Sequence, residues 1–376
     1  MLQHAIDTGA SAKNGSRLGA LSDDPGSQLR AGDPGDSADV AHILNRRLGS
    51  ELNAGPLRIE EGPTEEPHGW EAHVYRFRLE SQVPLPSPYD RALGLRAFDT
   101  PHALARARHE FDVMRAIHAL GYPVPRPLLY EEDCRFLGGP FLISSWVDGI
   151  TLLEWLRRGF WRLLSAAGKL ARLHLALHDL PLAGPLAPAD SFVERRLGEI
   201  ETTIADYELP ELAEGFVWLC RHRPVAAQRP SILHLDFHPA NVVVEHGQPH
   251  AVVDWSEADA GDRHADVAMT LVLLRTAPVS GETALERLLR RPARWWLARR
   301  YLRVYRHSAD LDPGVLRYYV AWAALRRLAV CLVWRRAGPW VHGFKTSAVQ
   351  YANPGHEESL RRVFRQATGI RLPASC

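Results

Sequence analysis

Three residues whose side chains could perform chemistry together lie in the stretch ILHLDFHPANVVVEHGQPHAVVDW: Asp236, Asn241 and Asp254. Two β-branched runs, NVVV and AVVD, flank the polar turn EHGQPH, and this pattern predicts a β-hairpin. A buried charge without a partner is costly in free energy. The two carboxylates therefore either face solvent or meet something cationic at the open end of the hairpin.

The register expected for this hairpin would bring two of these side chains together. If Val244 lies opposite Ala251, then Asn241 lies opposite Asp254, and opposed residues project to one face with Cβ atoms roughly 4.5–5.5 Å apart. A carboxamide and a carboxylate would then converge like the oxygen ligands of Mg²⁺. Asp236, on the loop before the first strand, could accept a proton from a molecule beside that metal. The alternative is a polar loop and hairpin with no ligand.

The longer motifs around these residues resemble a known family. HLDFHPAN matches the H-x-D-x-x-x-x-N catalytic loop of kinase-like phosphotransferases, and VVDW stands where protein kinases carry D-F-G. With AGDRHADVA downstream, the chain resembles the aminoglycoside phosphotransferase and choline kinase-like family. The resemblance runs from about Ala41 to the end of the chain, and it is most specific between His234 and Ala268.

The resemblance implies a role for each residue of these motifs. In that family the loop aspartate takes the proton of the acceptor hydroxyl, while the loop asparagine and the second aspartate hold metal ions on the nucleotide phosphates. These roles fall on Asp236, Asn241 and Asp254 respectively. The positions that brace the catalytic loop are matched by His234, Asp262 and Asp266.

The implied nucleotide site lies in the N-terminal part of the chain, before residue 148. Family members place a basic residue on the third strand and pair it with a helix glutamate, and Arg96 and Glu110 occupy those places. A guanidinium can bind phosphate oxygens as a lysine does. Backbone groups of the hinge would read the adenine edge, and the hinge falls on Ser145, Trp146 and Val147. The structural alternatives are a surface arginine, a solvated helix glutamate and a packed hinge aromatic.

Three features depart from the family pattern. Leu235 stands where the family commonly has glycine after the motif histidine. Trp255 replaces the Phe-Gly pair of D-F-G, so a protein-kinase-style flip of that segment is not expected. The stretch expected to cover the phosphates, EEGPTEEPHGWEAHV, lacks G-x-G-x-x-G, and its Glu61, Glu65 and Glu66 would repel phosphate.

The order of predicted elements indicates an α+β, bilobal protein-kinase-like fold, with a small β-rich N-lobe and a larger helical C-lobe. Residues 1–36 are rich in Gly, Ser, Asp and Ala and lack aromatics, so we expect a disordered tail. The N-lobe, residues 37–147, should bind nucleotide; residues 148–376 form the C-lobe, with the catalytic loop and acceptor-binding helices. The N-lobe elements are expected to be a helix over 37–52, strands over 57–62, 71–80 and 91–98, a helix over 100–122 capped by Thr100, and strands within 123–133 and 140–149.

Composition limits the partners. The chain has 376 residues with a formal net charge of +1, which gives no reason to expect nucleic acid or membrane as a partner. The arginine-rich stretch ERLLRRPARWWLARRYLRVYRH could contact nucleic acid, although an amphipathic helix with solvated arginines is favoured. The longest apolar run, YYVAWAALRRLAVCLVW, is broken by Arg326 and Arg327 and falls short of the ~18 residues of a membrane span. With scattered cysteines and no signal peptide, we expect a cytoplasmic protein.

The function expected from the sequence is that of a small-molecule kinase. It would use Mg²⁺ and transfer the γ-phosphoryl of ATP or GTP to a hydroxyl of a metabolite or antibiotic. One rival is a nucleotide-binding pseudokinase or regulatory module without turnover; another is nucleic-acid binding through the arginine-rich helix. The sequence leaves the oligomeric state open.

Acidic residues suggest the charge of the acceptor. A single short segment carries Glu199, Glu201, Asp206, Glu208, Glu211 and Glu214, and Glu257 and Asp259 follow the metal aspartate. A cleft lined by one sign of charge concentrates ligands of the other sign, so this set favours a cationic or amine-bearing acceptor. The alternative is a solvated helix face that offsets nearby arginines. His174, His178 and His238 have no second pair at zinc-ligand spacing.

Overall fold

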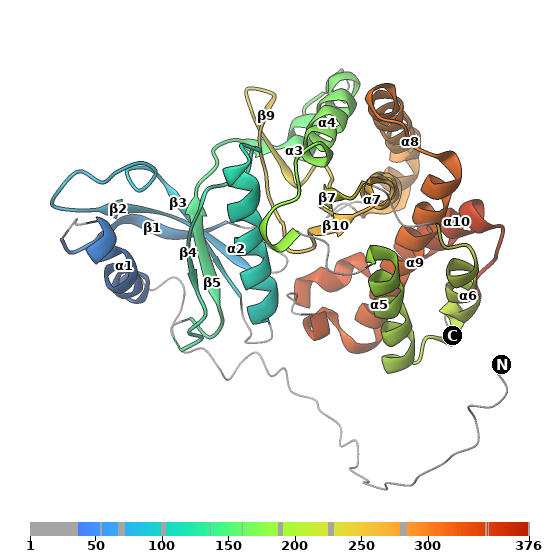
Figure 1. Cartoon of the computed structure of the whole chain (residues 1–376), viewed down its shortest axis with the longest axis horizontal. Helices are drawn as coiled ribbons and strands as arrows, with labels where there is room; N and C mark the ends of the chain where they lie inside the picture. The colour runs from blue at the N-terminus through green and yellow to red at the C-terminus, as the bar shows by residue number, and fades with distance from the viewer. Residues whose placement is uncertain are drawn as a thin grey trace, which may run out of the picture. The chain divides into compact units, whose positions relative to one another are not determined.

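A helix and a five-stranded sheet begin the part of the chain that the computed structural model describes (Figure 1). The described residues are 37–52, 55–66, 72–98, 103–135, 137–159, 161–186, 191–224, 229–278, 284–342, 344 and 346–374. The predicted tail, residues 1–36, lies outside them. Helix α1, Ser37–Leu52, coincides with the predicted helix.

The five-stranded sheet is antiparallel throughout, in the order β1-β2-β3-β5-β4. Its strands are β1 Arg58–Glu66, β2 His73–Glu80, β3 Leu93–Ala97, β4 Pro127–Glu131 and β5 Phe141–Ser145. The alternation read from the sequence is borne out in β2, where Tyr75 and Phe77 are buried while Arg76 and Arg78 reach solvent. Successive residues of a strand therefore face opposite sides of the sheet.

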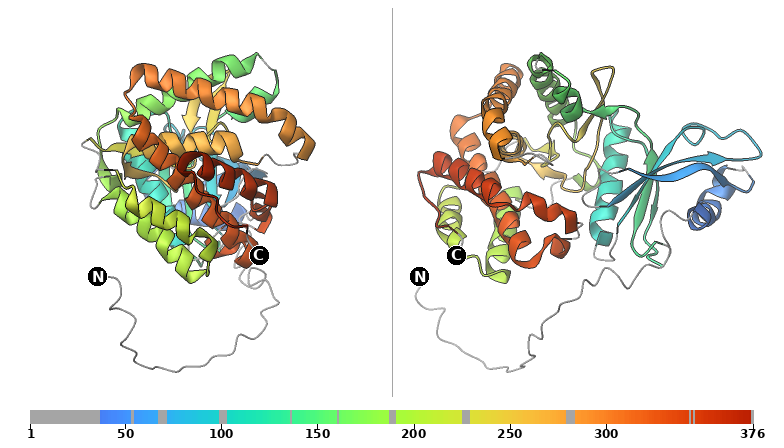
Figure 2. Two further views of the ribbon diagram at one scale, coloured as in Figure 1. Left: turned by 90° about the vertical axis from the view of Figure 1, so that its right-hand side faces the viewer. Right: turned by 180° about the vertical axis from the view of Figure 1, so that it is seen from behind.

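The two faces of the sheet carry different helices (Figures 1 and 2). Leu95 and Ile143 pack with Leu44 of α1 in one apolar cluster. Arg96 follows Leu95 and lies opposite Leu142 of β5, so it projects to the other face. Helix α2, Leu104–Ala119, covers that face, because Leu142 packs with residues of α2 and its start. The register of β3 thus places Arg96 under α2.

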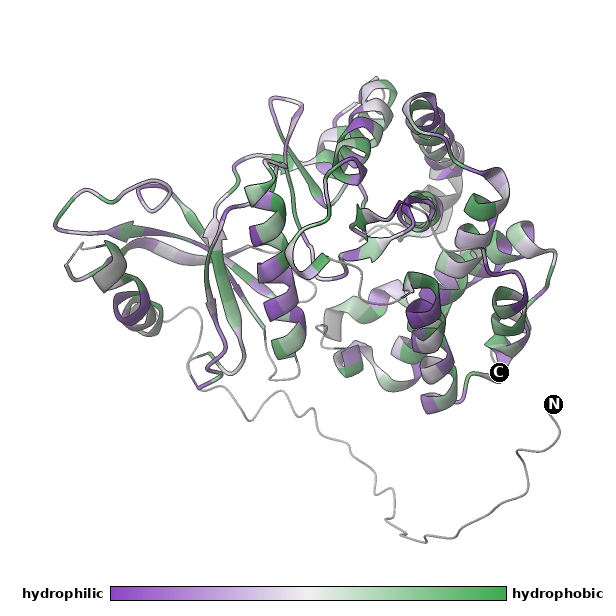
Figure 3. Ribbon diagram, in the orientation of Figure 1, coloured by the Kyte–Doolittle hydropathy of each residue, from purple (hydrophilic) through white to green (hydrophobic). Residues whose placement is uncertain are grey.

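Helix α2 joins the sheet to the helical region that follows. Its residue Ala107 packs on the sheet side, whereas Val113, Met114 and Ile117 belong to the core of the helical region. Apolar and polar residues alternate along this helix in Figure 3. Helix α2 begins at Leu104 with Ala103 at its cap position, so the predicted capping by Thr100, which is outside the described residues, does not define its start.

The remainder of the chain is mainly helical, as predicted. The helices are α3 Leu152–Arg157, α4 Arg162–His178, α5 Phe192–Asp206, α6 Ala213–Arg221, α7 Arg263–Thr276, α8 Ala284–Ser308, α9 Pro313–Ala337 and α10 Pro354–Thr368. Helix α7 is buried along almost its whole length and contacts α8, α9 and α10. Helix α8 is amphipathic, with Tyr301 and Tyr305 buried and Arg299 and Arg303 exposed.

Two small sheets interrupt these helices, one more than the predicted hairpin. Strands β8, Val242–Glu245, and β9, Gln248–Val252, form the hairpin, and β6, Ile150–Thr151, adds to β8. Strand β7, Ser231–Leu233, pairs with β10, Asp259–Gly261. The sequence missed β6, β7 and β10 because two or three residues show no periodicity.

The chain passes from the five-stranded sheet to β6 through residues 146–149, where the sequence placed the join between lobes. Gly149 has a φ of 131°, and a Cβ there would lie 2.5 Å from the carbonyl oxygen of Val244. This close approach requires glycine. In the part of the chain that is described, no helix combines the length and apolar character that a membrane span demands.

Candidate active site

The predicted catalytic loop leads from β7 to β8, and its aspartate is held from several sides. Asn241 Nδ2 donates a hydrogen bond to Asp236 Oδ2 at 2.9 Å. His238 Nε2 lies 3.3 Å from the same oxygen, and Arg327 Nη1 of α9 lies 3.7 Å from Oδ1. The structure therefore brings Asp236 and Asn241 together and adds two basic residues that the sequence had not placed there.

These neighbours keep Asp236 ionised. Burial by itself would raise the pKa of this carboxyl, but His238, Arg327 and His234 outweigh burial and hold its pKa well below the usual range. A carboxylate of low pKa is a weak base, so it suits orienting a hydroxyl and taking its proton late in a reaction.

The hairpin register differs from the predicted one by a single residue. Val243, not Val244, lies opposite Ala251, and Val244 lies opposite Pro249, so a bulge leaves His250 as an extra residue on β9. The N–H of Val253 donates to the carbonyl of Asn241 at 3.0 Å. The predicted opposition of Asn241 and Asp254 is wrong, because Asn241 lies opposite Val253 and Asp254 is the next residue along the chain.

Asp254 instead contacts the sheet. Arg96 Nη2 lies 3.2 Å from Asp254 Oδ1, and Arg96 Nη1 lies 3.1 Å from Glu110 Oε1. Asp254 has a φ of 68°, in the left-handed region that aspartate tolerates better than most residues. Burial raises the pKa of Glu110 to about 6, although Arg96 opposes that rise. The predicted pairing of Arg96 with Glu110 is present, and Glu110 is buried rather than solvated.

The oxygen atoms of Asn241 and Asp254 fit a hard cation. Within the described residues, the Oδ1 atom of Asn241 and the Oδ2 atom of Asp254 accept no hydrogen bond from the protein. A carboxylate and an amide oxygen form a donor set that suits Mg²⁺, which usually keeps waters and phosphates as further ligands. These two residues could therefore hold Mg²⁺ with a bound nucleotide.

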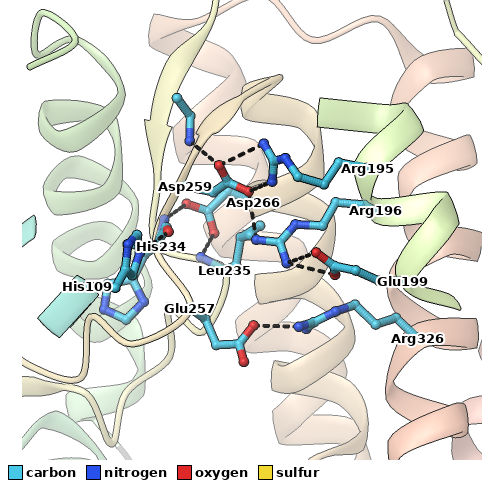
Figure 4. A network of polar contacts seen from close by, with 12 residues as sticks. His109, Arg195, Arg196, Glu199, His234, Leu235, Glu257, Asp259, Asp266 and Arg326 are labelled. Carbon is cyan, nitrogen blue, oxygen red and sulfur yellow. Dashed lines mark hydrogen bonds and ion pairs between the residues drawn. The ribbon is translucent and has the colours of Figure 1, made fainter. Parts of the chain in front are cut away.

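A buried aspartate fixes the backbone of the catalytic loop (Figure 4). Asp266 Oδ2 accepts from the N–H of His234 at 2.5 Å, and Oδ1 accepts from the N–H of Leu235 at 2.8 Å. The Nε2 atoms of His174 and His178 lie 3.0 and 3.2 Å from Oδ2. Burial would raise the pKa of Asp266, but His174 and His178 hold it well below its usual range. Asp266 thus holds the backbone of the loop at His234 and Leu235.

The two histidines that contact Asp266 are themselves anchored. His174 Nδ1 lies 2.7 Å from the hydroxyl of Tyr301, and His178 Nδ1 lies 2.6 Å from that of Tyr305. Burial lowers the pKa of His178 to about 4. His174, His178 and Asp266 have the spacing of a metal site, but both carboxylate oxygens of Asp266 already accept hydrogen bonds from the loop backbone.

His234 connects the loop with the segment that carries Asp254. Its Nδ1 accepts from the N–H of Asp236 at 3.3 Å, and its Nε2 lies 3.1 Å from the carbonyl oxygen of Val253. These partners indicate the tautomer with hydrogen on Nε2. His234 thus links the catalytic loop to the backbone beside Asp254.

Asp262 caps the helix that carries Asp266. Its Oδ1 atom accepts from the N–H of His264 at 2.9 Å and contacts His264 Nδ1 at 2.5 Å. It therefore caps the N-terminus of α7 and makes no hydrogen bond to the catalytic loop within the described residues. Its influence on the site passes through α7, which carries Asp266.

The hinge residues follow β5. The N–H of Trp146 donates to the carbonyl of Ala92 at 3.0 Å, so it is not free to meet a ligand. The Trp146 ring packs near Gly94 and under the guanidinium of Arg76. The N–H of Val147 makes no hydrogen bond with the described part of the chain. The hydroxyl of Ser145 accepts from the N–H of Arg126 at 2.9 Å.

The stretch predicted to cover the phosphates is described in part. Residues 67–71, which contain Gly69, lie outside the described residues. On β1 and β2, Glu61 lies 3.4 Å from Arg78, and Glu65 lies 2.6 Å from His73. These pairs partly offset the repulsion of phosphate expected from the glutamates.

A pocket of about 350 Å³ adjoins the site (Figure 4). Its lining includes Ser256, whose hydroxyl donates to Asp254 Oδ1 at 3.4 Å. The other polar residues of the lining are His109, Arg195, Arg196, Glu199, Glu257, Asp259 and Arg326.

The acids of this pocket are paired with arginines. Arg195 and Arg196 lie 2.6 and 2.7 Å from Asp259. Arg196 also lies 2.9 Å from Glu199, and Arg326 contacts Glu257. The acidic cleft that the sequence predicted is therefore not formed by these residues, because each carboxylate has a guanidinium partner.

Sequence reasoning missed the basic residues from α5 and α9. Arg326 and Arg327 were recognised merely as the pair that breaks an apolar run. Two adjacent arginines inside an otherwise buried helix were the available signal, because such residues require partners or a ligand.

The comparison with protein families decides the relationship. Residues 64–294 match the family model described as phosphotransferase enzyme family. The chain belongs to this family. The predicted family is thus confirmed, and so is the predicted α+β fold, because the solved structures it resembles include several aminoglycoside phosphotransferases.

Two solved structures illustrate the shared fold. A mutant of aminoglycoside phosphotransferase APH(4)-Ia, in a ternary complex with AMP-PNP and hygromycin B, is 18% identical; the alignment has a TM-score of 0.57 and covers 88% of this chain and 100% of that one. An amicoumacin kinase in complex with AMP-PNP and Ca²⁺ is 17% identical, with a TM-score of 0.50 over 81% of this chain and 89% of that one.

Curated relatives are much longer proteins. Acyl-CoA dehydrogenase family member 10 of Mus musculus is 28% identical over 223 residues, which are 54% of this chain and 19% of that protein. Family member 11 of Homo sapiens is 27% identical over 175 residues, which are 42% of this chain and 22% of that protein. The match thus spans about a fifth of the length of either relative.

Proposed function

We propose that this protein is a kinase that transfers the γ-phosphoryl group of ATP, or of GTP, to a hydroxyl of a small molecule. The observation that carries the proposal is the Arg96–Asp254 ion pair. It joins a phosphate-binding candidate on the sheet to a metal-binding candidate beside the catalytic loop. The AMP-PNP held by two structures of similar fold supports a nucleotide co-substrate.

Each residue of the site has a separate role in the proposed phosphoryl transfer. Asp236 orients the acceptor hydroxyl through its Oδ1 atom, since Oδ2 is held by Asn241. The hydroxyl oxygen forms a bond to the γ-phosphorus while the bond to the bridging oxygen breaks, the nucleoside diphosphate leaves, and the hydroxyl proton passes to Asp236. Arg96, held by Glu110, meets the phosphate oxygens. The loop stays in place through His234 and Asp266.

Asn241 and Asp254 would hold Mg²⁺ on the nucleotide. When bound, the metal supplies positive charge that offsets the charge of the phosphate oxygens during transfer. Arg96 partly neutralises the charge of the same region, because it pairs with Asp254. At the hinge, the N–H of Val147 would donate a hydrogen bond to the edge of the purine base.

The test of the proposal is phosphoryl transfer itself. Purified protein with Mg²⁺ and either ATP or GTP should convert hydroxyl acceptors from a mixed set of alcohols, sugars, aminoglycosides and hydroxy acids into phosphate esters. The Asp236→Asn variant should bind nucleotide but lose transfer by roughly a hundredfold or more. Nucleotide binding with no turnover on any acceptor would instead support the pseudokinase alternative.

A further inference from the structure

Arg327, whose guanidinium lies beside Asp236, differs in its contacts from the arginines of the nearby pocket. Arg195, Arg196 and Arg326 each donate hydrogen bonds to a carboxylate. Arg327 contacts a carboxylate at 3.7 Å and makes no hydrogen bond within the described residues. Its side chain is 27% exposed, so it is largely desolvated yet still reaches solvent. Because a guanidinium carries five N–H donors, Arg327 retains its capacity to bind an anion.

The geometry of Asp236 places this guanidinium on the acceptor side. Oδ2 of Asp236 faces Asn241 and His238, and Asn241 is one of the two proposed ligands of Mg²⁺. Oδ1 is the oxygen left for the acceptor hydroxyl, and Arg327 is the cation next to it. A hydroxyl hydrogen-bonded to Oδ1 at roughly 2.7 Å would therefore bring its neighbouring carbon substituents within reach of Arg327.

Building on the proposed kinase activity, we propose that the acceptor carries an anionic group, a carboxylate or a phosphate, close to its reacting hydroxyl and that Arg327 binds it. Arginine binds either anion through two parallel N–H bonds, which would also fix the orientation of the hydroxyl. An ammonium at the same place would face repulsion at short range from Arg327. The nearby pocket offers no compensating attraction for a cation, because Glu199, Glu257 and Asp259 are already paired. The amine-bearing acceptor expected from the sequence is thus disfavoured.

The test uses acceptors that differ in one group. The panel contains short hydroxy acids and the corresponding primary amides, amino alcohols and hydroxyalkyl phosphates. It separates the effect of the acceptor's charge on turnover from the effect of its shape. The wild-type protein should phosphorylate one of the two anionic classes with a kcat/KM at least about tenfold above the matched amide and amino alcohol. The preference between carboxylate and phosphate identifies which anion is the natural one.

Variants connect the preference to Arg327. Arg327→Gln should raise KM for the anionic acceptor roughly tenfold to a hundredfold and leave KM for the amide and for the nucleotide unchanged. Arg327→Glu should reverse the order so that amino alcohols become the better acceptors. Arg303→Gln removes an exposed arginine of α8 and should change none of these values. Nucleotide titration of each variant shows whether it is folded.

Distinct outcomes overturn the two proposals. If neutral or amine acceptors are phosphorylated and anionic ones are not, or if Arg327→Gln affects all acceptors equally, the inference about Arg327 is wrong while the kinase proposal stands. If no acceptor of any charge is phosphorylated by the wild-type protein, both are wrong.

Discussion

Arg96 and Asp254 lie 158 positions apart in the sequence, and their side chains are 3.2 Å apart in the structure. The same guanidinium lies 3.1 Å from Glu110, which is buried. The pair of contacts connects the sheet, helix α2 and the segment after β9. The charge of Arg96 therefore bears on both the stability of the protein and the proposed activity.

Arg96→Ala should remove activity, whereas Arg96→Lys should keep much of it, because either cation can meet phosphate. The alanine variant should also lose about 3 kcal/mol of unfolding free energy, since it leaves Glu110 buried without its partner. Denaturant unfolding and transfer assays measure the two effects. Arg78→Ala, on the exposed side of β2, is the control and should cost less than about 1 kcal/mol. Full activity of Arg96→Ala would make Arg96 purely structural.

Asp254→Asn should lower Mg²⁺-dependent turnover by about a hundredfold or more, because it removes the negative charge that would hold the metal. Asparagine tolerates the left-handed backbone found at this position, so the fold should persist. The measurement is turnover across a Mg²⁺ titration, with Asp148→Asn as control, because the side chain of Asp148 is 70% exposed. Unchanged Mg²⁺ dependence would show that the metal is held by other residues.

Asp266→Ala should destabilise the protein far more than Asp262→Ala, although the two aspartates are one helical turn apart. The first change leaves two backbone N–H groups and two histidines without their buried acceptor, at a cost of about 3–5 kcal/mol. The second removes a helix cap worth about 1 kcal/mol. Chemical denaturation of both variants tests this order, and equal losses would contradict it.

Leu235→Gly should be more stable than Leu235→Ala by about 1 kcal/mol. The backbone of Leu235 has a φ of 59°, which glycine adopts without strain and alanine does not. Both variants lose the packing of a side chain that is 1% exposed, so both should be less stable than the wild type, by about 2–5 kcal/mol for alanine. Thermal unfolding of the two variants isolates the backbone strain. A glycine variant less stable than the alanine variant would refute that account.

Glu257→Gln should lower stability at neutral pH by about 2 kcal/mol, allowing for the partial exposure of the pair. Arg326 and, more weakly, Arg196 lower the pKa of Glu257 to about 2 against the opposing effect of burial. A depressed carboxyl pKa stabilises the folded state above the unfolded value of 4.5, and this stabilisation is lost as the pH falls toward 2. The difference between wild type and variant should therefore be constant from pH 8 to 5 and shrink below pH 4.5. A difference in unfolding free energy that grows as the pH falls would contradict this prediction.

The sequence by itself determined the parts of the site that are contiguous in the chain. His234, Asp236 and Asn241 lie within one loop, so their short separation along the chain limits their separation in space. The alternation of β2 and the helical periods likewise indicated the elements, because burial on one face leaves a pattern in neighbouring residues.

Only the tertiary structure decided which distant charges meet. The hairpin closes through a two-residue turn, with Glu245 opposite Gln248, and carries a bulge at His250, so Asn241 lies opposite Val253 and not Asp254. Hydrophobic alternation carries no signal for either feature. The pairing of Arg196 with Asp259, and the approach of Arg327 to Asp236, depend on how α5 and α9 pack around the loop. Charged side chains act over a few ångströms in space, and separation along the chain does not set that distance. The sequence therefore located the reacting groups, while the packing of the helices determined the charge beside them.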